Sequence, residues 1–225
     1  MIIVSEVRSA LASAADPAKA AGMQAYMKSA LPFRGAQKPA RTRALRAVFD
    51  SRPLPSGAVW AATVRELWHG AEFREERYAA IDLTGHRMYR SYQRPDVLAL
   101  YEELIVTGAW WDFVDEIASR RVGPILRAFP GQVGPLMRTW AVDGDLWRRR
   151  TAILCQLGAR EAVDLRLLEN CLEPNLADRE FFIRKAIGWA LRDYAWHDPG
   201  WVRSWVDQHA ERLSPLSLRE ATKHL

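Results

Sequence analysis

The sequence predicts an all-α protein built from successive helix pairs, and three observations support this fold class. Apolar residues recur at the three- and four-residue spacing of amphipathic helices along most of the 225 residues. Gly, Pro and Asp interrupt these stretches, so neighbouring helices should run antiparallel. No stretch reads as a strand, and helix–turn–helix units recur at about 35 to 45 residues, as in HEAT-like arrays. We expect a single domain over residues 1–225 that forms a HEAT-like helical-repeat superhelix with a concave binding face.

Composition sets limits on the class of protein. The two cysteines, Cys155 and Cys171, lack the spacing of a zinc site or a disulfide framework. The first residues do not resemble a signal peptide, and no apolar run approaches the roughly 18 residues of a membrane span. The net charge is +5, mostly from arginine, with a sequence pI near 9.5, which is compatible with nucleic-acid binding. We expect a cytoplasmic monomer without metal or cofactor.

The first half of the chain contains a breaker-rich loop between helical stretches. Residues 5–28 predict one or two amphipathic helices, with Asp16-Pro17 at a helix start. The loop at residues 31–39 opens a helix that carries several arginines, so it is either a phosphate cradle or a solvated helix face. Further helices are expected at residues 60–68 and 73–90 and, opened by Pro95, through residue 105.

A tryptophan-rich helix is expected at residues 110–118. Its periodicity places Trp110 with Val114 and Ile117 on a core stripe and turns Trp111 and Asp115 together to another face. An aromatic ring and a carboxylate one turn apart, away from the core, resemble a site. The alternative is that Trp111 covers the edge of the core while Asp115 is solvated. The next helices are expected at residues 122–129, 135–142, 145–157 and 162–172.

The helix at residues 145–157 places one arginine among apolar side chains. Arg150 projects onto the same stripe as Leu146 and Ile153. A guanidinium in that position needs an acceptor, because an unpaired buried charge is very unfavourable. Asp115 is the expected partner. The alternative is that Arg150 extends to solvent along its apolar stem.

A long helix at residues 178–194 combines a core stripe with a mixed aromatic and basic face. Trp189 lies off the core stripe, and its face is suited to stacking and phosphate neutralisation. The alternative is a helix packed on two sides by its neighbours in the array. The expected core stripe is Ile183, Ile187, Ala190 and Tyr194, and the residues beside Trp189 are Phe182, Lys185 and Arg192.

Several motifs together resemble the AlkD family of bacterial alkylpurine DNA glycosylases. They are PFRG at 32–35, WWDFVD at 110–115, RRTAIL at 149–154, FFIRKAIGW at 181–189 and LSPLSLREA at 213–221. The resemblance implies a HEAT-like superhelix that excises cationic N3- or N7-alkylated purines from duplex DNA without base flipping. It implies that Trp111, Asp115, Arg150 and Trp189 form the catalytic group. We expect contacts with the DNA backbone from Lys38, Arg41, Arg43, Arg148, Lys185 and Arg192.

Three other functions compete with this interpretation. The first is a non-catalytic HEAT-like protein that binds damaged or branched DNA, although such a protein gains nothing from a carboxylate that faces phosphate. The second is a helical scaffold for another protein, for which an apolar groove is expected rather than the basic face around Trp189. A glycoside hydrolase built on Asp112 and Asp115 is disfavoured, because these acids lie on one short helix without an opposing pair.

Overall fold

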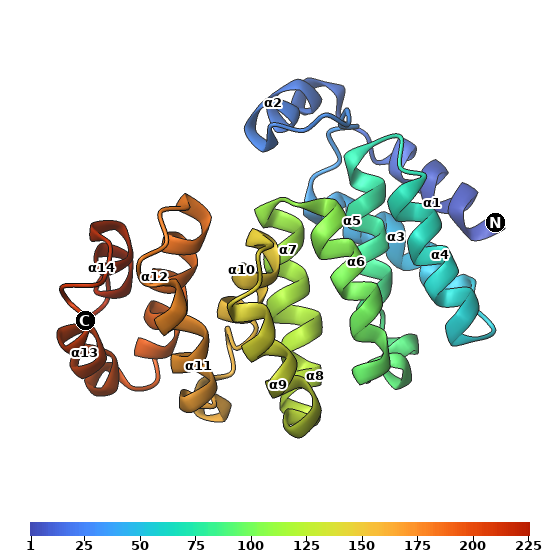
Figure 1. Cartoon of the computed structure of the whole chain (residues 1–225). Helices are drawn as coiled ribbons and strands as arrows, with labels where there is room; N and C mark the ends of the chain where they lie inside the picture. The colour runs from blue at the N-terminus through green and yellow to red at the C-terminus, as the bar shows by residue number, and fades with distance from the viewer. The chain divides into compact units, whose positions relative to one another are not determined.

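The computed structural model describes every residue from Met1 to Leu225. It contains fourteen α-helices and no β-strand, so the predicted all-α class is confirmed (Figure 1). The chain divides into two compact units, Met1–Tyr92 and Gln93–Leu225. The single domain and the concave face expected from the sequence stay predictions.

The first unit contains five α-helices and a terminal 3-10 segment. Its core includes the fully buried side chains of Val7, Leu11, Val64 and Leu67. The helix that carries Val64 begins after Ser56, whose hydroxyl accepts a hydrogen bond from the backbone N–H of Val59 at 3.2 Å. The elements are α1 (Ile2–Ser13), α2 (Pro17–Met27), α3 (Lys38–Ser51), α4 (Gly57–His69), α5 (Arg74–Thr84) and the 3-10 segment Arg87–Tyr92.

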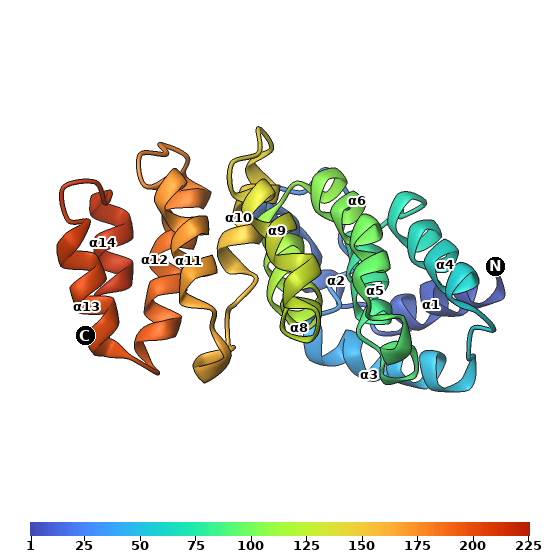
Figure 2. The same cartoon turned by 60° about the horizontal axis from the view of Figure 1, so that its bottom comes forward.

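The second unit contains the remaining nine α-helices, joined by short segments. Figures 1 and 2 show them following one another from α6 to α14. They are α6 (Leu98–Gly108), α7 (Trp111–Ile117), α8 (Gly123–Ala128), α9 (Pro130–Ala141), α10 (Leu146–Leu154), α11 (Leu165–Leu172), α12 (Phe181–Ala195), α13 (Pro199–Gln208) and α14 (Pro215–Ala221). The short segments are Pro95–Val97, Ala118–Val122, Arg160–Ala162 and Glu173–Asn175.

The helices of the second unit pack in the repeated manner that the sequence predicts. Helix α10 contacts both α7 and α12, and α12 contacts α14, so these four helices follow one another side by side. Helices α9 and α11 pack against α10 and against each other, and α13 packs against α12. Helices α10 and α12 therefore each pack against several neighbours, as in other helical-repeat proteins. The series α7, α10 and α12 positions the candidate site.

The contact between α12 and α14 requires a glycine. A Cβ atom at Gly188 would lie 2.4 Å from the Cβ of Glu220 and 2.8 Å from the backbone oxygen of Ser217. The Ser217 hydroxyl donates a hydrogen bond to the Arg184 carbonyl at 2.9 Å across the same contact. The two helices therefore approach each other closely at Gly188, and a side chain at this position would separate them.

Several helix boundaries differ from those expected. The helix expected at residues 73–90 ends at Thr84, because Gly85 has a low helix propensity, and a separate 3-10 segment follows. Helix α9 begins at Pro130 rather than at residue 135, since a proline fits the first turn of a helix. Helix α11 begins after Asp164, whose carboxylate accepts a hydrogen bond from the N–H of Leu167 at 3.0 Å.

Candidate functional site

Asp115 and Arg150 form a buried, two-pronged ion pair in the second unit. Nε of Arg150 donates to Oδ1 of Asp115 at 2.7 Å, and Nη2 donates to Oδ2 at 2.8 Å. The two residues are only 8% and 4% exposed. This parallel arrangement is the strongest form of a carboxylate–guanidinium contact. The structure confirms Asp115 as the partner of Arg150, and it excludes the alternative in which Arg150 extends to solvent.

The helices explain why these two side chains meet. Helix α10 begins after Asp145, whose carboxylate accepts hydrogen bonds from the N–H groups of Trp147 and Arg148, both at 2.9 Å. This start places Arg150 on the buried stripe next to Ile153. Because α7 packs directly against α10, the guanidinium meets the carboxylate of α7.

Arg150 also reaches a third helix. Its Nη1 atom donates a hydrogen bond to the carbonyl oxygen of Phe182, in the first turn of α12. The guanidinium carbon lies 5.8 Å from the centre of the Phe182 ring. One arginine therefore joins α7, α10 and α12, and each of its three nitrogen atoms donates a hydrogen bond. A backbone carbonyl has no sequence signature, so sequence reasoning missed this contact.

Burial governs the ionisation of Asp115. Loss of hydration raises the pKa of the Asp115 carboxyl above its ordinary value, while the hydrogen bonds and charge of Arg150 oppose that rise. The nearby negative charge of Asp112 adds a further small increase to the pKa. A buried ion pair is weak evidence for a stabilising role, whereas a carboxyl whose pKa is shifted by burial and by a specific charged partner is a candidate for a functional site.

The two predicted site tryptophans lie on α7 and α12, the two helices that Arg150 contacts from α10. Trp111 is the first residue of α7, one helical turn before Asp115, and is half-buried. Trp189 is half-buried on α12, seven residues after Phe182. Seven residues are two turns, so Trp189 lies on the same face of α12 as Phe182, about 10 Å further along the helix axis. The structure thus brings Asp115 and Arg150 into contact and places a tryptophan on each flanking helix.

Trp110 belongs to an aromatic cluster that the sequence did not reveal. Its ring centre lies 5.6 Å from that of Phe182 and 6.4 Å from that of Trp147, and Phe182 and Trp147 are 5.1 Å apart. Trp110 itself precedes α7 and is half-buried, while Val114 and Ile117 are fully buried as expected. The cluster packs the start of α12 against α7 and α10, next to the hydrogen bond between Arg150 and Phe182.

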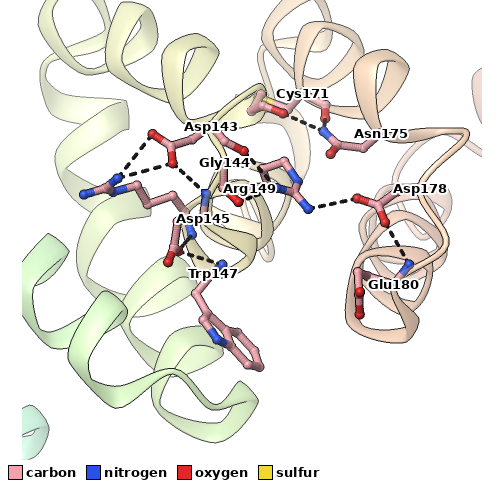
Figure 3. A network of polar contacts seen from close by, with 11 residues as sticks. Asp143, Gly144, Asp145, Trp147, Arg149, Cys171, Asn175, Asp178 and Glu180 are labelled. Atoms are coloured by element: carbon pink, nitrogen blue, oxygen red, sulfur yellow. Dashed lines mark hydrogen bonds and ion pairs between the residues drawn. The ribbon is translucent and has the colours of Figure 1, made fainter.

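Arg149 ties the segments before α10 and α12 to each other. Figure 3 shows its guanidinium between the carbonyl oxygens of Asp143 and Gly144 on one side and the carboxylate of Asp178 on the other. The distances are 2.8, 3.1 and 3.0 Å, respectively. Asp178 in turn accepts a hydrogen bond from the N–H of Glu180 at the start of α12. Arg149 therefore supports the position of α12 from which Phe182 meets Arg150.

The three cations of the second unit that were expected to contact DNA are all paired with carboxylates. Arg148 lies 2.8 Å from Glu102 and 3.2 Å from Asp143. Both Lys185 and Arg192 pair with Glu220 of α14, at 2.9 and 2.6 Å. The sequence pattern placed Lys185 and Arg192 correctly on the face of Trp189, but it did not reveal Glu220, which lies 28 residues beyond Arg192.

Helix α3 of the first unit carries the other expected DNA contacts, and they differ in exposure. Lys38, its first residue, and Arg43 are exposed. Arg41 is only 7% exposed, and its Nε atom donates to Asp82 at 3.0 Å. Its guanidinium also lies over the ring of Tyr78, with 4.6 Å between the centres. An internal carboxylate and an aromatic ring thus already bind the guanidinium of Arg41, which disfavours a phosphate contact there, and the expected contact stays a prediction.

The loop before α3 is occupied from within, which disfavours the phosphate cradle, one of the two alternatives that the sequence left open there. The buried carboxylate of Glu75 accepts hydrogen bonds from the N–H groups of Arg34 and Ala36 at 3.0 to 3.1 Å. The guanidinium of Arg34 lies 3.6 Å from Glu76 and 3.7 Å from the ring centre of Phe73. These contacts occupy two backbone donors of the loop and draw the guanidinium of Arg34 to an internal carboxylate.

The chain has neither a metal-binding cluster nor an exposed thiol. No group of three or more His, Cys, Asp and Glu side chains is placed to hold a metal ion. Cys155 and Cys171 are buried free thiols, and burial raises the pKa of Cys171 to about 12. None of the helices has both the length and the apolar character that crossing a membrane requires.

Comparisons with known proteins found a matching family and a similar solved structure. The family model described as "DNA alkylation repair enzyme" matches residues 7–225. A solved structure described as a predicted DNA alkylation repair enzyme from Enterococcus faecalis is similar in fold, with a TM-score of 0.82 and 28% sequence identity. The match covers 94% of this chain and 96% of that one. A search of curated proteins found no match. The chain belongs to the family of DNA alkylation repair enzymes.

Proposed function

We propose that the protein is a monofunctional DNA glycosylase that hydrolyses the N-glycosidic bond of cationic N3- or N7-alkylated purines in duplex DNA. Membership of a DNA alkylation repair family supports a role in repair, and the AlkD-like motifs support this reaction. The observation that carries the proposal is the buried Asp115 carboxylate, held by Arg150 and one turn from Trp111.

The chemistry requires little more than a well-placed negative charge. Alkylation at N3 or N7 makes the purine a cation and weakens its bond to the sugar. As the bond between C1′ and nitrogen breaks, the base leaves with the bonding electrons and becomes neutral, and positive charge develops on the sugar. Water then bonds to C1′ and loses a proton. A preorganised carboxylate stabilises the developing charge, and it does so most effectively where water is scarce.

Asp115 retains the capacity to perform this task while it is paired. Each carboxylate oxygen has two lone pairs, and Arg150 uses one on each oxygen. The remaining lone pairs can orient a water molecule toward C1′. The side chain is 11% exposed, so it is largely shielded from water without being fully enclosed. Arg150 fixes the direction of the carboxylate before the substrate arrives, which removes a reorganisation step from the reaction.

The two tryptophans suit a cationic lesion. The faces of indole rings attract cations and pack against sugar C–H groups. Trp111 and Trp189 are both half-buried, so each presents part of its ring while its helix fixes its position. We propose that they contact the damaged nucleotide from two helices without flipping it into a deep pocket.

The proposal is tested by single-turnover release of 7-methylguanine from a methylated duplex, with wild-type protein beside Asp115→Asn. We expect the variant to lose at least about 100-fold in rate, the usual effect of removing one preorganised electrostatic group. Duplex affinity should remain within about twofold. Asparagine keeps an oxygen that can accept from Arg150, so the variant should fold, and circular dichroism checks this.

The outcomes separate the competing functions. Full activity in Asp115→Asn would exclude the assigned role of the carboxylate. Tight duplex binding without release by either protein would support the alternative, a non-catalytic protein that binds damaged or branched DNA.

A further inference from the structure

Glu220 of α14 bridges the two cations that flank Trp189. Its Oε1 atom lies 2.9 Å from Nζ of Lys185, and its Oε2 atom lies 2.6 Å from Nη1 of Arg192. The side chain of Glu220 is 15% exposed, compared with 39% for Lys185 and 22% for Arg192. The ammonium of Lys185 and the guanidinium of Arg192 together hold the pKa of the Glu220 carboxyl below its usual range. The carboxylate is therefore ionised at neutral pH.

Helix geometry fixes this bridge next to Trp189. Lys185 precedes Trp189 by four residues and Arg192 follows it by three, so all three side chains lie on one face of α12. Gly188, the residue before Trp189, faces the Cβ atom of Glu220. The close approach of α12 and α14 that Gly188 permits brings the single carboxylate within reach of cations two turns apart.

The bridge changes what these cations offer to DNA. A lysine or arginine contributes to duplex affinity when it neutralises a phosphate and releases a counterion. In the free protein, Lys185 and Arg192 share the single negative charge of Glu220, which partly offsets both of their charges. A phosphate that approaches these cations competes with the carboxylate for their charge, so the gain from each contact is smaller than at an unpaired cation.

We propose that Glu220 competes with the DNA backbone for Lys185 and Arg192, and that it thereby sets the affinity and the salt dependence of duplex binding next to Trp189. The inference rests on the proposed function, because it takes the face of Trp189 as the DNA-binding face. A weak hold on undamaged duplex would let the protein leave sites that lack a cationic lesion.

The test is equilibrium binding of Glu220→Gln to an undamaged duplex over a series of salt concentrations. We expect tighter binding than wild type at low salt. The slope of log K against log salt should become steeper by about 0.9 for each released cation that finds a phosphate, and so by up to about 1.8. The matched control is Glu161→Gln, which removes the same charge at an exposed carboxylate outside α12 and α14. It should change the slope by much less.

Two outcomes would overturn the inference. One is an equal slope in Glu220→Gln and Glu161→Gln, and the other is weaker duplex binding by a folded Glu220→Gln. If Glu220→Gln does not fold, Glu220→Asp replaces it. This shorter carboxylate cannot span both cations and should steepen the slope by about 0.9.

The readout separates this inference from the glycosylase proposal. A steeper slope in a protein that releases no 7-methylguanine would support competition by Glu220 while refuting the glycosylase. Release by wild type with an unchanged slope in Glu220→Gln would refute only the competition. The double variant Lys185→Gln and Arg192→Gln provides a further check, because adding Glu220→Gln to it should leave the slope unchanged.

Discussion

At the residue scale, Asp115 must satisfy two opposing requirements. The proposed reaction needs its carboxylate ionised, whereas burial favours the neutral form and raises its pKa. Arg150 resolves this conflict through two hydrogen bonds to the carboxylate. An isolated buried carboxyl would accept a proton instead of acting as an anion. The guanidinium is therefore as necessary to the proposed chemistry as the carboxylate.

The raised pKa of Asp115 predicts how activity depends on pH. As the pH falls, Asp115 takes up a proton at a higher pH than an ordinary aspartate does, and the fraction of active carboxylate falls with it. The single-turnover rate should decline about tenfold per pH unit once the pH lies below that pKa. Rates must be corrected for spontaneous base loss, measured without protein. A rate that stays flat down to the ordinary pKa of aspartate would contradict the assignment.

The residues of the site differ in how well the sequence predicts them. The pairing of Asp115 with Arg150 was predictable, because an arginine on an apolar stripe requires a buried acceptor. The contact of Arg150 with the Phe182 carbonyl was not, since every residue carries a carbonyl. The pairing of Glu220 with Lys185 was also unpredictable from periodicity, because it depends on how two helices dock.

At the element scale, the contact of α12 with α14 should be sensitive to one methyl group. Gly188→Ala would place its Cβ 2.8 Å from the backbone oxygen of Ser217 and 2.4 Å from the Cβ of Glu220, so the helices must separate. We expect the free energy of unfolding to fall by about 1–3 kcal/mol, the usual effect of overpacking. Urea denaturation measures it.

A matched glycine controls for helix propensity. A Cβ at Gly131, in the first turn of α9, meets no atom within 4 Å. Gly131→Ala should therefore leave the stability unchanged or raise it by up to about 1 kcal/mol. Equal effects of the two substitutions would contradict the close packing of α12 and α14.

Helix α3 allows a comparison of two arginines that are two residues apart. Arg43 is exposed and Arg41 is buried against Asp82 and Tyr78. If Arg43 contacts a phosphate, Arg43→Gln should reduce the salt slope of duplex binding by about 0.9. Arg41→Gln should leave that slope unchanged and instead lower the free energy of unfolding by about 1–3 kcal/mol, because it leaves a partly buried carboxylate unpaired. Binding titrations and urea denaturation distinguish the two effects.

At the scale of the whole molecule, the net charge is a poor guide to which cations meet DNA. The sequence predicted the order of the helices because periodicity and breakers are local signals. It could not predict which arginines are neutralised internally, since such pairs join distant segments. Four arginines each lie within 4 Å of a carboxylate that is at least 28 positions away in the sequence. They are Arg34, Arg41, Arg148 and Arg192. The net charge of +5 thus conceals a surface on which only part of the basic residues is available to phosphate.

The whole site predicts selectivity for charge on the lesion rather than for its shape. The residues at the site supply a carboxylate and two half-buried indole rings, all of which favour a cation, and the proposed reaction does not use a strong general acid. A cationic 7-methylguanine leaves as a neutral base, whereas neutral hypoxanthine would leave as an anion and needs a proton. We therefore expect single-turnover release of hypoxanthine to be at least about 100-fold slower, the lower end of the usual contribution of a general acid. Comparable rates for the two bases would show that the protein protonates its leaving group, and would require an acid that Asp115, Arg150 and the two tryptophans do not provide.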